Sequence, residues 1–271
     1  MNATEFKTRL RGGQSVYGTL LVSTSPRYPA EVAKIGLDFV FIDTEHIAID
    51  RGLLSWMCQT YRGYGLTPIV RVSAPDPYQA CMVLDGGAGG VIAPYVETAE
   101  EARALVGAVK YRPLKGRKLE RFLAGQEKLE PELQAYLDKN NASNSLILNI
   151  ESMPAIAALD EILAVPGIDG VLIGPHDLSC SAGVPERYDA PEFNAAVRTI
   201  FSKARAKGVG AGIHAWMGVD RAAEFARAGA NMIVHEADII SFRDNVREDL
   251  VRLRGLMGEK VAASDKSAVN I

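Results

Sequence analysis

Two stretches decide the fold: Leu146-Ile147-Leu148-Asn149-Ile150-Glu151-Ser152 and Val171-Leu172-Ile173-Gly174-Pro175-His176-Asp177-Leu178-Ser179. Each is a short apolar run with strand character that ends in a carboxylate and then in helix-starting residues. One helical segment, 153–164, separates them. In alternating strand–helix proteins the carboxyl ends of the strands carry the chemistry. Two carboxylates at neighbouring strand ends would supply half of a site for a hard divalent cation.

The same strand–helix alternation extends over the whole chain. Most of the expected strands are nearly continuous apolar runs, which is typical of parallel strands buried on both faces. We expect strands at Val16–Val22, Phe39–Thr44, Pro68–Val72, Gly90–Tyr95, Leu146–Glu151, Gly170–Ile173, Gly210–His214 and Met232–His235. Eight strand–helix units predict a closed (β/α)₈ TIM barrel, of the α/β class, formed by residues 1–257 as a single domain.

Helical patterns fall between these strands. They are expected at Pro29–Ile35, Asp50–Tyr61, Pro77–Leu84, Thr98–Val109, Pro154–Leu163, Pro191–Lys207, Val219–Ala228 and Phe242–Leu256. Asp50 is a plausible N-cap, and Thr98 followed by Glu101 has the spacing of a capping box. A doubly wound open sheet is the alternative fold. It is disfavoured because the glycine-rich run 86–90 precedes a strand instead of joining a strand to a helix.

Two segments stand outside the repeat. Tyr111 to Ser145 is long, and its first half is strongly basic. It connects a helix to a strand, so we expect it on the amino-end side of the barrel, and its role is left open. The tail 258–271 lacks a periodic apolar face and is predicted to be disordered.

Composition excludes several classes of protein. The chain has 271 residues and a formal net charge of −3 with both signs interspersed, which argues against nucleic acid or a membrane surface as the main partner. The first 14 residues lack the apolar core of a signal peptide, and no apolar run is long enough to span a membrane. The three cysteines lack metal-type spacing and are expected to be reduced core residues. We therefore expect a cytoplasmic protein.

Further polar residues follow the other strands. The second strand ends in Asp43, Glu45 and His46, and the third ends at Arg71. His46 is a candidate proton carrier, its ring oriented by Asp43 or Glu45, although a structural histidine is the plainer interpretation. Arg71 is either a fixed cation for a carboxylate or developing oxyanion, or a partner in a surface ion pair.

The remaining strand ends are less informative. His214 and the pair His235-Glu236 lie near the last two strand ends, and a structural role is the more probable interpretation for both histidines. His176 is expected to form a side wall of the site. No expected strand contains or ends in lysine, which argues against a Schiff-base mechanism and favours a metal.

At these residues the sequence resembles the HpcH/HpaI aldolase family, the metal-dependent class II pyruvate aldolases that include 2,4-dihydroxyhept-2-ene-1,7-dioate aldolase. The resemblance extends over about residues 18–253. Its motifs are the segments 41–46, 70–72, 85–91 with Pro94, 98–102, 150–151 and 174–179. Each is weak alone, but their order and joint presence are specific for the family, though not for its substrate.

The resemblance implies roles for the polar residues. Glu151 and Asp177 are expected to be the metal ligands, and Arg71 to hold the oxygen of a keto acid and stabilise its enolate. His46, paired with Asp43, is expected to transfer protons. Glu45 would steady a metal-bound water.

The resemblance also implies a substrate-binding turn and an assembly. Backbone groups at Gly174, Pro175, His176 and Asp177 would receive the pyruvate carboxylate. Family members are usually homo-oligomers, hexamers or trimers, often with the last helix packed on a neighbouring subunit, and Phe242–Leu256 is the equivalent helix.

The sequence departs from the family pattern at three places. Asn149 replaces the usual glutamine two residues before the metal glutamate, so a shorter amide would meet the metal-bound water. The segment 116–120 loses a glycine that is usual there, which leaves the aldehyde acceptor open. The end of the last strand, 234–238, is unusually polar.

The predicted reaction is reversible aldol cleavage of a 4-hydroxy-2-oxo acid into pyruvate, or a close 2-oxo acid, and an aldehyde. The cofactor is expected to be Mg²⁺ or Mn²⁺, with Co²⁺ or Zn²⁺ as alternatives. The base for the 4-hydroxyl proton is His46 or a metal-bound hydroxide that it helps to form. The rival hypotheses are a citramalyl- or malyl-CoA-type lyase, a barrel glycosidase using paired carboxylates, and a non-catalytic keto-acid binder.

Overall fold

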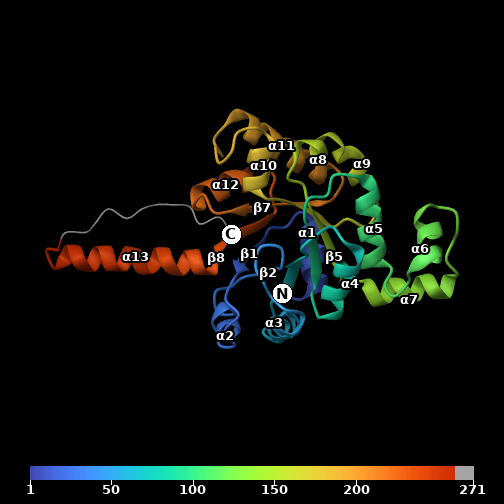
Figure 1. Ribbon diagram of the computed structural model, residues 1–271, viewed down its shortest axis with the longest axis horizontal. Helices are drawn as coiled ribbons and strands as arrows, with labels where there is room; N and C mark the ends of the chain where they lie inside the picture. Colours follow the sequence, from blue (N-terminus) through green and yellow to red (C-terminus); the bar gives the residue numbers. More distant parts are fainter. Residues whose placement is uncertain (260–271) are drawn as a thin grey trace.

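The computed structural model describes residues 1–259, and its centre is a closed parallel barrel of eight strands in chain order (Figure 1). The strands are β1 Val16–Leu21, β2 Phe39–Asp43, β3 Thr67–Arg71, β4 Gly90–Ala93, β5 Ser145–Asn149, β6 Gly170–Ile173, β7 Gly210–Ala215 and β8 Met232–Ala237. All eight predicted strands and the (β/α)₈ fold are confirmed. The predicted disordered tail lies, from residue 260 onward, outside the described residues.

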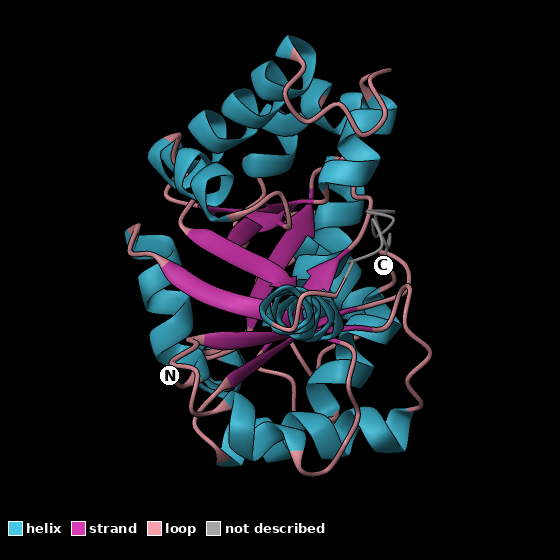
Figure 2. Cartoon of the chain, turned by 90° about the vertical axis from the view of Figure 1, so that its left-hand side faces the viewer, coloured by secondary structure: helices cyan, strands magenta, loops and turns pink. Residues whose placement is uncertain are grey.

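Helices surround the barrel and connect its strands (Figures 1 and 2). The main ones are α2 Tyr28–Val32, α3 Arg51–Gly63, α4 Pro77–Asp85, α5 Ala99–Lys110, α11 Pro191–Ala206, α12 Val219–Arg227 and α13 Asp238–Leu256. The predicted caps are present. Asp50 accepts hydrogen bonds from the amides of residues 52 and 53 at 2.9 and 3.0 Å, and Thr98 with Glu101 forms a reciprocal capping box.

Sequence patterns missed four helices and merged two others. The missed helices are α1 Ala3–Gly12, α6 Gly116–Leu123, α7 Pro131–Asn141 and α10 Pro175–Ser181. The predicted helix Pro154–Leu163 is divided at Ala158 into α8 Met153–Ala157 and α9 Leu159–Leu163. The 111–145 segment is thus largely helical, and α6 packs on α5 through Leu119 and Leu123, which lie against Gly107.

Helix α1 closes the amino end of the barrel. Its buried side chains Phe6 and Leu10 belong to the same apolar cluster as the inward-facing strand residues. Leu10 lies so close to β7 that a Cβ on Gly210 would come within 2.3 Å of it, so the strand needs glycine there. Burying each side chain contributes about 1.5–3 kcal/mol. A second, larger apolar cluster fills the layer between strands and helices.

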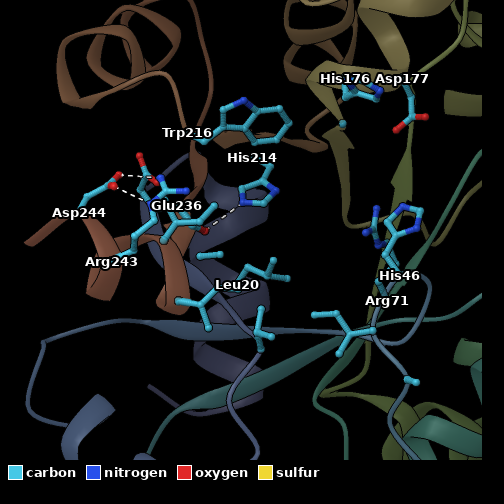
Figure 3. A pocket seen from close by; sticks show the side chains of 17 residues that line it. Leu20, His46, Arg71, His176, Asp177, His214, Trp216, Glu236, Arg243 and Asp244 are labelled. Carbon is cyan, nitrogen blue, oxygen red and sulfur yellow. Dashed lines mark hydrogen bonds and ion pairs between the residues drawn. The ribbon is translucent and has the colours of Figure 1, made fainter. Parts of the chain in front are cut away.

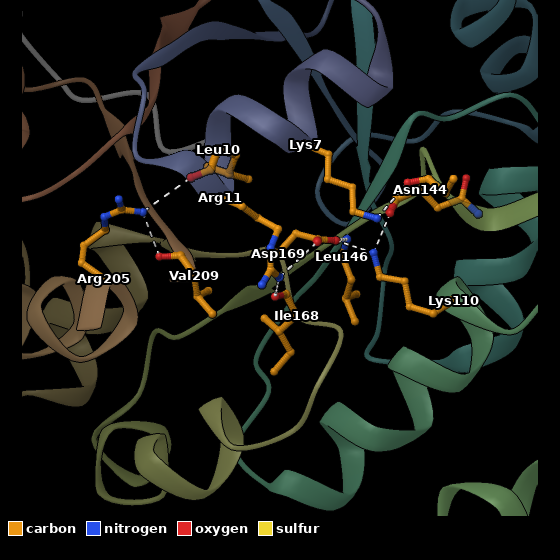
Figure 4. A network of polar contacts seen from close by, with 11 residues as sticks. Lys7, Leu10, Arg11, Lys110, Asn144, Leu146, Ile168, Asp169, Arg205 and Val209 are labelled. Carbon is orange, nitrogen blue, oxygen red and sulfur yellow. Dashed lines mark hydrogen bonds and ion pairs between the residues drawn. The ribbon is translucent and has the colours of Figure 1, made fainter. Parts of the chain in front are cut away.

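A polar network lies next to α1 at the same amino end (Figure 4). The buried carboxylate of Asp169 forms ion pairs with Lys110 and with Arg11, the latter at 3.5 Å, and accepts the amide hydrogen of Leu146 at 2.9 Å. Burial lowers the pKa of Lys110 to about 8, while the charge of Asp169 opposes that shift. The network ties α1, α5 and the starts of β5 and β6 together.

Helix α13 differs from the other helices because it projects away from the barrel (Figures 1 and 2). It begins four residues before the predicted helix, and of its residues only Asp238 is buried. Both oxygens of Asp238 accept backbone amide hydrogens from residues 22 and 23, at 3.0 and 2.9 Å, and so fix the base of the helix to the end of β1. No helix among the described residues combines the length and the apolar character needed to cross a membrane.

Candidate active site

A cavity of about 740 Å³ opens at the carboxyl ends of the strands, where the sequence predicted the chemistry (Figure 3). Five of the predicted residues line it: His46, Arg71, Gly174, His176 and Asp177. The other predicted site residues do not line the cavity: Asp43, Glu45, Asn149, Glu151 and Pro175. Strand register explains the convergence, because β2 and β3 pair with Asp43 directly opposite Arg71.

Arg71 is held by two carboxylates. Its Nε and one terminal nitrogen donate to the two oxygens of Asp43 at 2.8 and 2.7 Å, and its other terminal nitrogen lies 3.1 Å from Glu45 Oε2. Burial alone would raise the pKa of Asp43, but the hydrogen bonds and charge of Arg71 outweigh it and keep that pKa below its usual value. Burial raises the pKa of Glu45 in spite of Arg71. The guanidinium is therefore fixed in one orientation.

The predicted pairing of His46 with Asp43 is not what the structure shows. Both oxygens of Asp43 bind Arg71, and one of them also accepts the amide hydrogen of Glu45 at 3.0 Å. The neighbour of the His46 ring is Glu45, whose Oε2 lies 3.8 Å from Nε2. The reason is geometric: Asp43 ends β2 beside Arg71, whereas His46 lies in the loop beyond the strand, half exposed to the cavity. Of the two residues expected to orient His46, only Glu45 is in place.

Glu151 and Asp177 converge on one point. A Cβ built on Gly174 would lie 2.4 Å from Glu151 Oε2 and 3.4 Å from Asp177 Oδ2, so glycine keeps that point free. The Glu151 carboxylate accepts the Tyr95 amide hydrogen at 2.9 Å and the Asn149 side-chain amide at 2.8 Å. Burial, followed by the charge of Asp177, raises the pKa of Glu151 to about 7.

This pair fits a divalent cation. The Asp177 carboxylate has no hydrogen bond or ion pair with any residue of the described part of the chain, and the buried Oδ1 of Asn149 is also without a partner. Two unneutralised carboxylates near each other disfavour ionisation unless a cation joins them. Within residues 1–259 no group of three or more potential ligand side chains surrounds one point. Glu151 and Asp177 would thus supply two protein oxygens and leave the other positions to small molecules.

The start of α10 faces the same space. Gly174 is the N-cap, no side chain caps the helix, and Pro175 lacks an amide hydrogen. The amides of His176 and Asp177 have no acceptor within the helix, as is general in a first turn. The role predicted for residues 174–177, binding of a carboxylate, stays a prediction.

The opposite side of the cavity carries residues that the sequence did not single out as ligands. They come from β7, β8 and the base of α13 and are called the β7–β8 wall: His214, Trp216, Glu236, Arg243 and Asp244 (Figure 3). His214 and Glu236 were visible as polar strand ends. Trp216, Arg243 and Asp244 were missed because nothing in sequence spacing indicates that the first turns of α13 line the cavity.

The cysteines agree in part with the sequence. Cys58 and Cys81 are buried among apolar side chains, as expected. Cys180 is exposed on α10, so the prediction of a core residue is wrong there. It lies one helical turn after His176 on α10, a helix that the sequence patterns did not predict.

Comparison with known proteins gives consistent results. A family model described as "HpcH/HpaI aldolase/citrate lyase" matches residues 17–244. The chain is 34% identical over 261 residues, 96% of this chain and 97% of the relative, to a 2-keto-3-deoxy-L-rhamnonate aldolase of Escherichia coli K12. It is similar in structure to an HpcH/HpaI aldolase/citrate lyase family protein from Burkholderia cenocepacia J2315, with a TM-score of 0.80, 26% identity and coverage of 93% and 99% of the two chains. It is also similar to the citrate synthase SbnG, with a TM-score of 0.79, 29% identity and coverage of 93% and 98%.

Proposed function

Because the chain belongs to the HpcH/HpaI aldolase/citrate lyase family and is a carbon–carbon lyase, we propose that it reversibly cleaves a 4-hydroxy-2-oxo acid into pyruvate, or a close 2-oxo acid, and an aldehyde. The observation that supports this most is the carboxylate pair of buried Glu151 and half-buried Asp177 beside the fixed cation Arg71. The pair suits a divalent ion, and Arg71 suits the charge that develops on a keto oxygen.

The proposed cofactor is Mg²⁺ or Mn²⁺, held by Glu151 and Asp177. Carboxylate oxygens are hard ligands that suit these two ions, and they suit Co²⁺ or Zn²⁺ less well. When bound, such an ion polarises the keto group and stabilises the enolate as a Lewis acid. Asn149 and the Tyr95 amide orient Glu151 for this task through their hydrogen bonds.

Arg71 is proposed to bind the 2-oxo oxygen as the bond between C3 and C4 of the substrate breaks. Asp43 and Glu45 hold its guanidinium in place, so little reorganisation is needed when negative charge develops. The amides at the start of α10, which no side chain caps, are proposed to receive the substrate carboxylate.

His46 is proposed to accept the 4-hydroxyl proton in cleavage and to return it in synthesis. Its ring lines the cavity, and Glu45 Oε2 lies 3.8 Å from its Nε2. Proton transfer through His46 therefore depends on Glu45, whereas Asp43 acts on Arg71.

The names of the relatives limit the substrate class without fixing it. One relative is named for a 3-deoxy-2-keto sugar acid, which is a 4-hydroxy-2-oxo acid in the general sense. Another is named a citrate synthase, so the same scaffold also builds carbon–carbon bonds from other acids.

The experiment that tests this function is solvent-deuterium exchange into the methyl group of pyruvate, followed by NMR. We expect exchange with added Mg²⁺ or Mn²⁺ and none after chelation, because enolate formation alone releases the methyl proton. Exchange that survives chelation would contradict the metal role. Absence of exchange with every divalent ion would favour a CoA thioester, another 2-oxo acid or a binding-only barrel.

A homo-oligomer formed through α13 is also proposed. The helix and its C-cap residue carry apolar side chains at three- and four-residue spacing, and none of them is buried: Ile239, Phe242, Val246, Leu250, Leu253 and the C-cap Met257. Phe242 is 69% exposed and Leu253 is 55% exposed, and together these residues form a continuous patch of the kind that marks an interface. A second copy of the chain is the proposed occupant.

Sedimentation tests this assembly. Leu250→Gln should shift the particle toward smaller oligomers, since it places an amide in the apolar stripe. Glu248→Gln, which changes an exposed residue off the stripe, should leave the distribution unchanged. A monomeric wild-type chain, or equal behaviour of the two variants, would contradict the proposal.

A further inference from the structure

The β7–β8 wall faces the half of the cavity that lies away from Arg71 and Asp177 (Figure 3). If the keto acid occupies the Arg71 side, as proposed above, this other half receives the aldehyde. The chemistry of the wall then decides which aldehyde is accepted. This assignment of the wall to the aldehyde rests on the proposed aldolase function.

His214 contributes a hydrogen-bond acceptor. Its Nε2 lies 3.0 Å from the backbone carbonyl oxygen of Glu236, and a carbonyl only accepts, so Nε2 carries the hydrogen. Burial lowers the pKa of His214 to about 4, which keeps the ring neutral. Nδ1 is then a lone-pair acceptor with no partner in the described part of the chain. The edge of Trp216, at 4.9 Å between ring centroids, holds the ring in place.

Glu236 contributes a second acceptor at the cost of backbone strain. Its φ is +53°, in the left-handed region that disfavours residues with a Cβ. Its carboxylate forms no hydrogen bond or ion pair with residues 1–259. A strained, non-glycine residue that brings an unpartnered carboxylate to a cavity indicates a functional constraint, since glycine would fit the backbone better.

The wall has no free cation. Arg243 donates two hydrogen bonds to its neighbour Asp244, at 2.7 and 3.0 Å, so its charge is already matched. Burial and the charge of Asp244 raise the pKa of Glu236, and the charge of Arg243 opposes that shift. Two carboxylates thus share the wall with one guanidinium, which leaves one negative charge when Glu236 is ionised. A carboxylate or phosphate on the aldehyde would meet repulsion there, whereas a hydroxyl group would find two acceptors.

We propose that Glu236 and His214 select an uncharged aldehyde that carries a hydroxyl group, and that they disfavour aldehydes bearing an acid group. Glu236 is the specificity-determining residue, and His214 supplies the second acceptor. This names the acceptor class for the proposed aldolase.

The test measures kcat/KM for addition of pyruvate to three aldehydes: 2-hydroxypropanal, propanal and succinate semialdehyde. For the wild type we expect the hydroxyaldehyde to exceed each of the others by roughly 10-fold or more, because a site built for a hydroxyl rejects analogues without it. Glu236→Gln should reduce the preference over succinate semialdehyde by about 10-fold, since it removes the repelling charge. Glu120→Gln makes the same charge change on exposed α6 and should preserve the preference.

Glu236→Gly separates a functional role from a structural one. Glycine tolerates φ near +53°, so the thermal midpoint should rise while the hydroxyl preference falls. Equal use of the three aldehydes by the wild type, a preference for the acid, or an unchanged preference in both Glu236 variants would overturn the proposal. Metal-dependent deuterium exchange into pyruvate, measured on the wild type, distinguishes these results from failure of the aldolase function itself.

Discussion

At the amino end of the barrel the carboxylate of Asp169 is surrounded by cations of the chain, whereas at the carboxyl end Glu151 and Asp177 face each other without one. Asp169 pairs with Lys110 and Arg11 and also accepts a backbone amide hydrogen. Arg71, whose charge also acts on Glu151, is already bound by Asp43 and Glu45. Both ends bury negative charge, but only at the amino end do cationic side chains of the same chain neutralise it.

This difference separates stability from function within one barrel. A buried charge that its own chain neutralises fixes neighbouring elements, and its loss is costly. A buried charge left unmatched lowers stability and is retained where a ligand will neutralise it. Mutations at the two ends should therefore affect different quantities.

The largest effect is expected from Asp177→Ala. Removing one of two metal ligands should reduce metal-dependent exchange of pyruvate roughly 1,000-fold or more, beyond the roughly 10–100-fold that loss of a residue supporting a ligand causes. The thermal midpoint should stay the same or rise, because a like-charge pair is relieved. Asp220→Ala, at an exposed position outside the cavity, serves as the matched control. Full activity of the Asp177 variant would remove the site assignment.

At the other end, Asp169→Asn should act on stability. It leaves Lys110 buried without its counter-charge, which typically costs about 3–5 kcal/mol. Urea unfolding at pH 7 measures this loss, and the exchange rate per folded molecule should change little. A variant as stable as the wild type but catalytically impaired would reverse the comparison between the two ends.

A matched pair of asparagines sharpens the same contrast. Asn149 donates to Glu151, and Asn144 donates to the backbone of α5 at 3.2 Å near Asp169. Asn149→Ala should weaken Mn²⁺ binding by roughly 10–100-fold, measured by calorimetry. Asn144→Ala should lower the free energy of unfolding by about 1–3 kcal/mol and leave Mn²⁺ affinity unchanged. Equal metal affinities of the two variants would exclude a supporting role for Asn149.

The sequence predicted the barrel well because each parallel strand is a separate apolar run with a clear end. It placed Glu151 and Asp177 at the carboxyl ends of two strands for the same reason, since each follows such a run within a few residues. It did not predict α1, because Phe6 and Leu10 are two apolar residues in a polar stretch and become core residues only when they close the barrel.

Contacts between helices and strands could not be predicted from the sequence alone. The pairing of Asp43 with Arg71 depends on the register of β2 and β3, and the sequence alone left Asp43 equally available to His46. The β7–β8 wall combines residues of three elements, and Arg243 belongs to a helix that looked like an ordinary surface helix. Local patterns thus identified which residues reach the rim, while tertiary geometry decided what each one contacts.

The smallest predicted effect is a pH dependence of the free energy of unfolding that arises at the carboxyl end, from His214. His214 has a folded-state pKa of about 4, set by burial, against about 6.5 in an unfolded chain. Between pH 4 and pH 6.5 the unfolded chain binds a proton at this histidine that the folded chain does not. The free energy of unfolding therefore has its full value above pH 6.5 and decreases as the pH falls toward 4. We expect a loss of about 1–3 kcal/mol over this window in wild-type urea titrations. His214→Asn should remove that part of the slope, because asparagine does not titrate. An unchanged slope would mean that other groups set it and that His214 is protonated as easily in the folded chain as in the unfolded one, which would also remove the neutral acceptor from the β7–β8 wall.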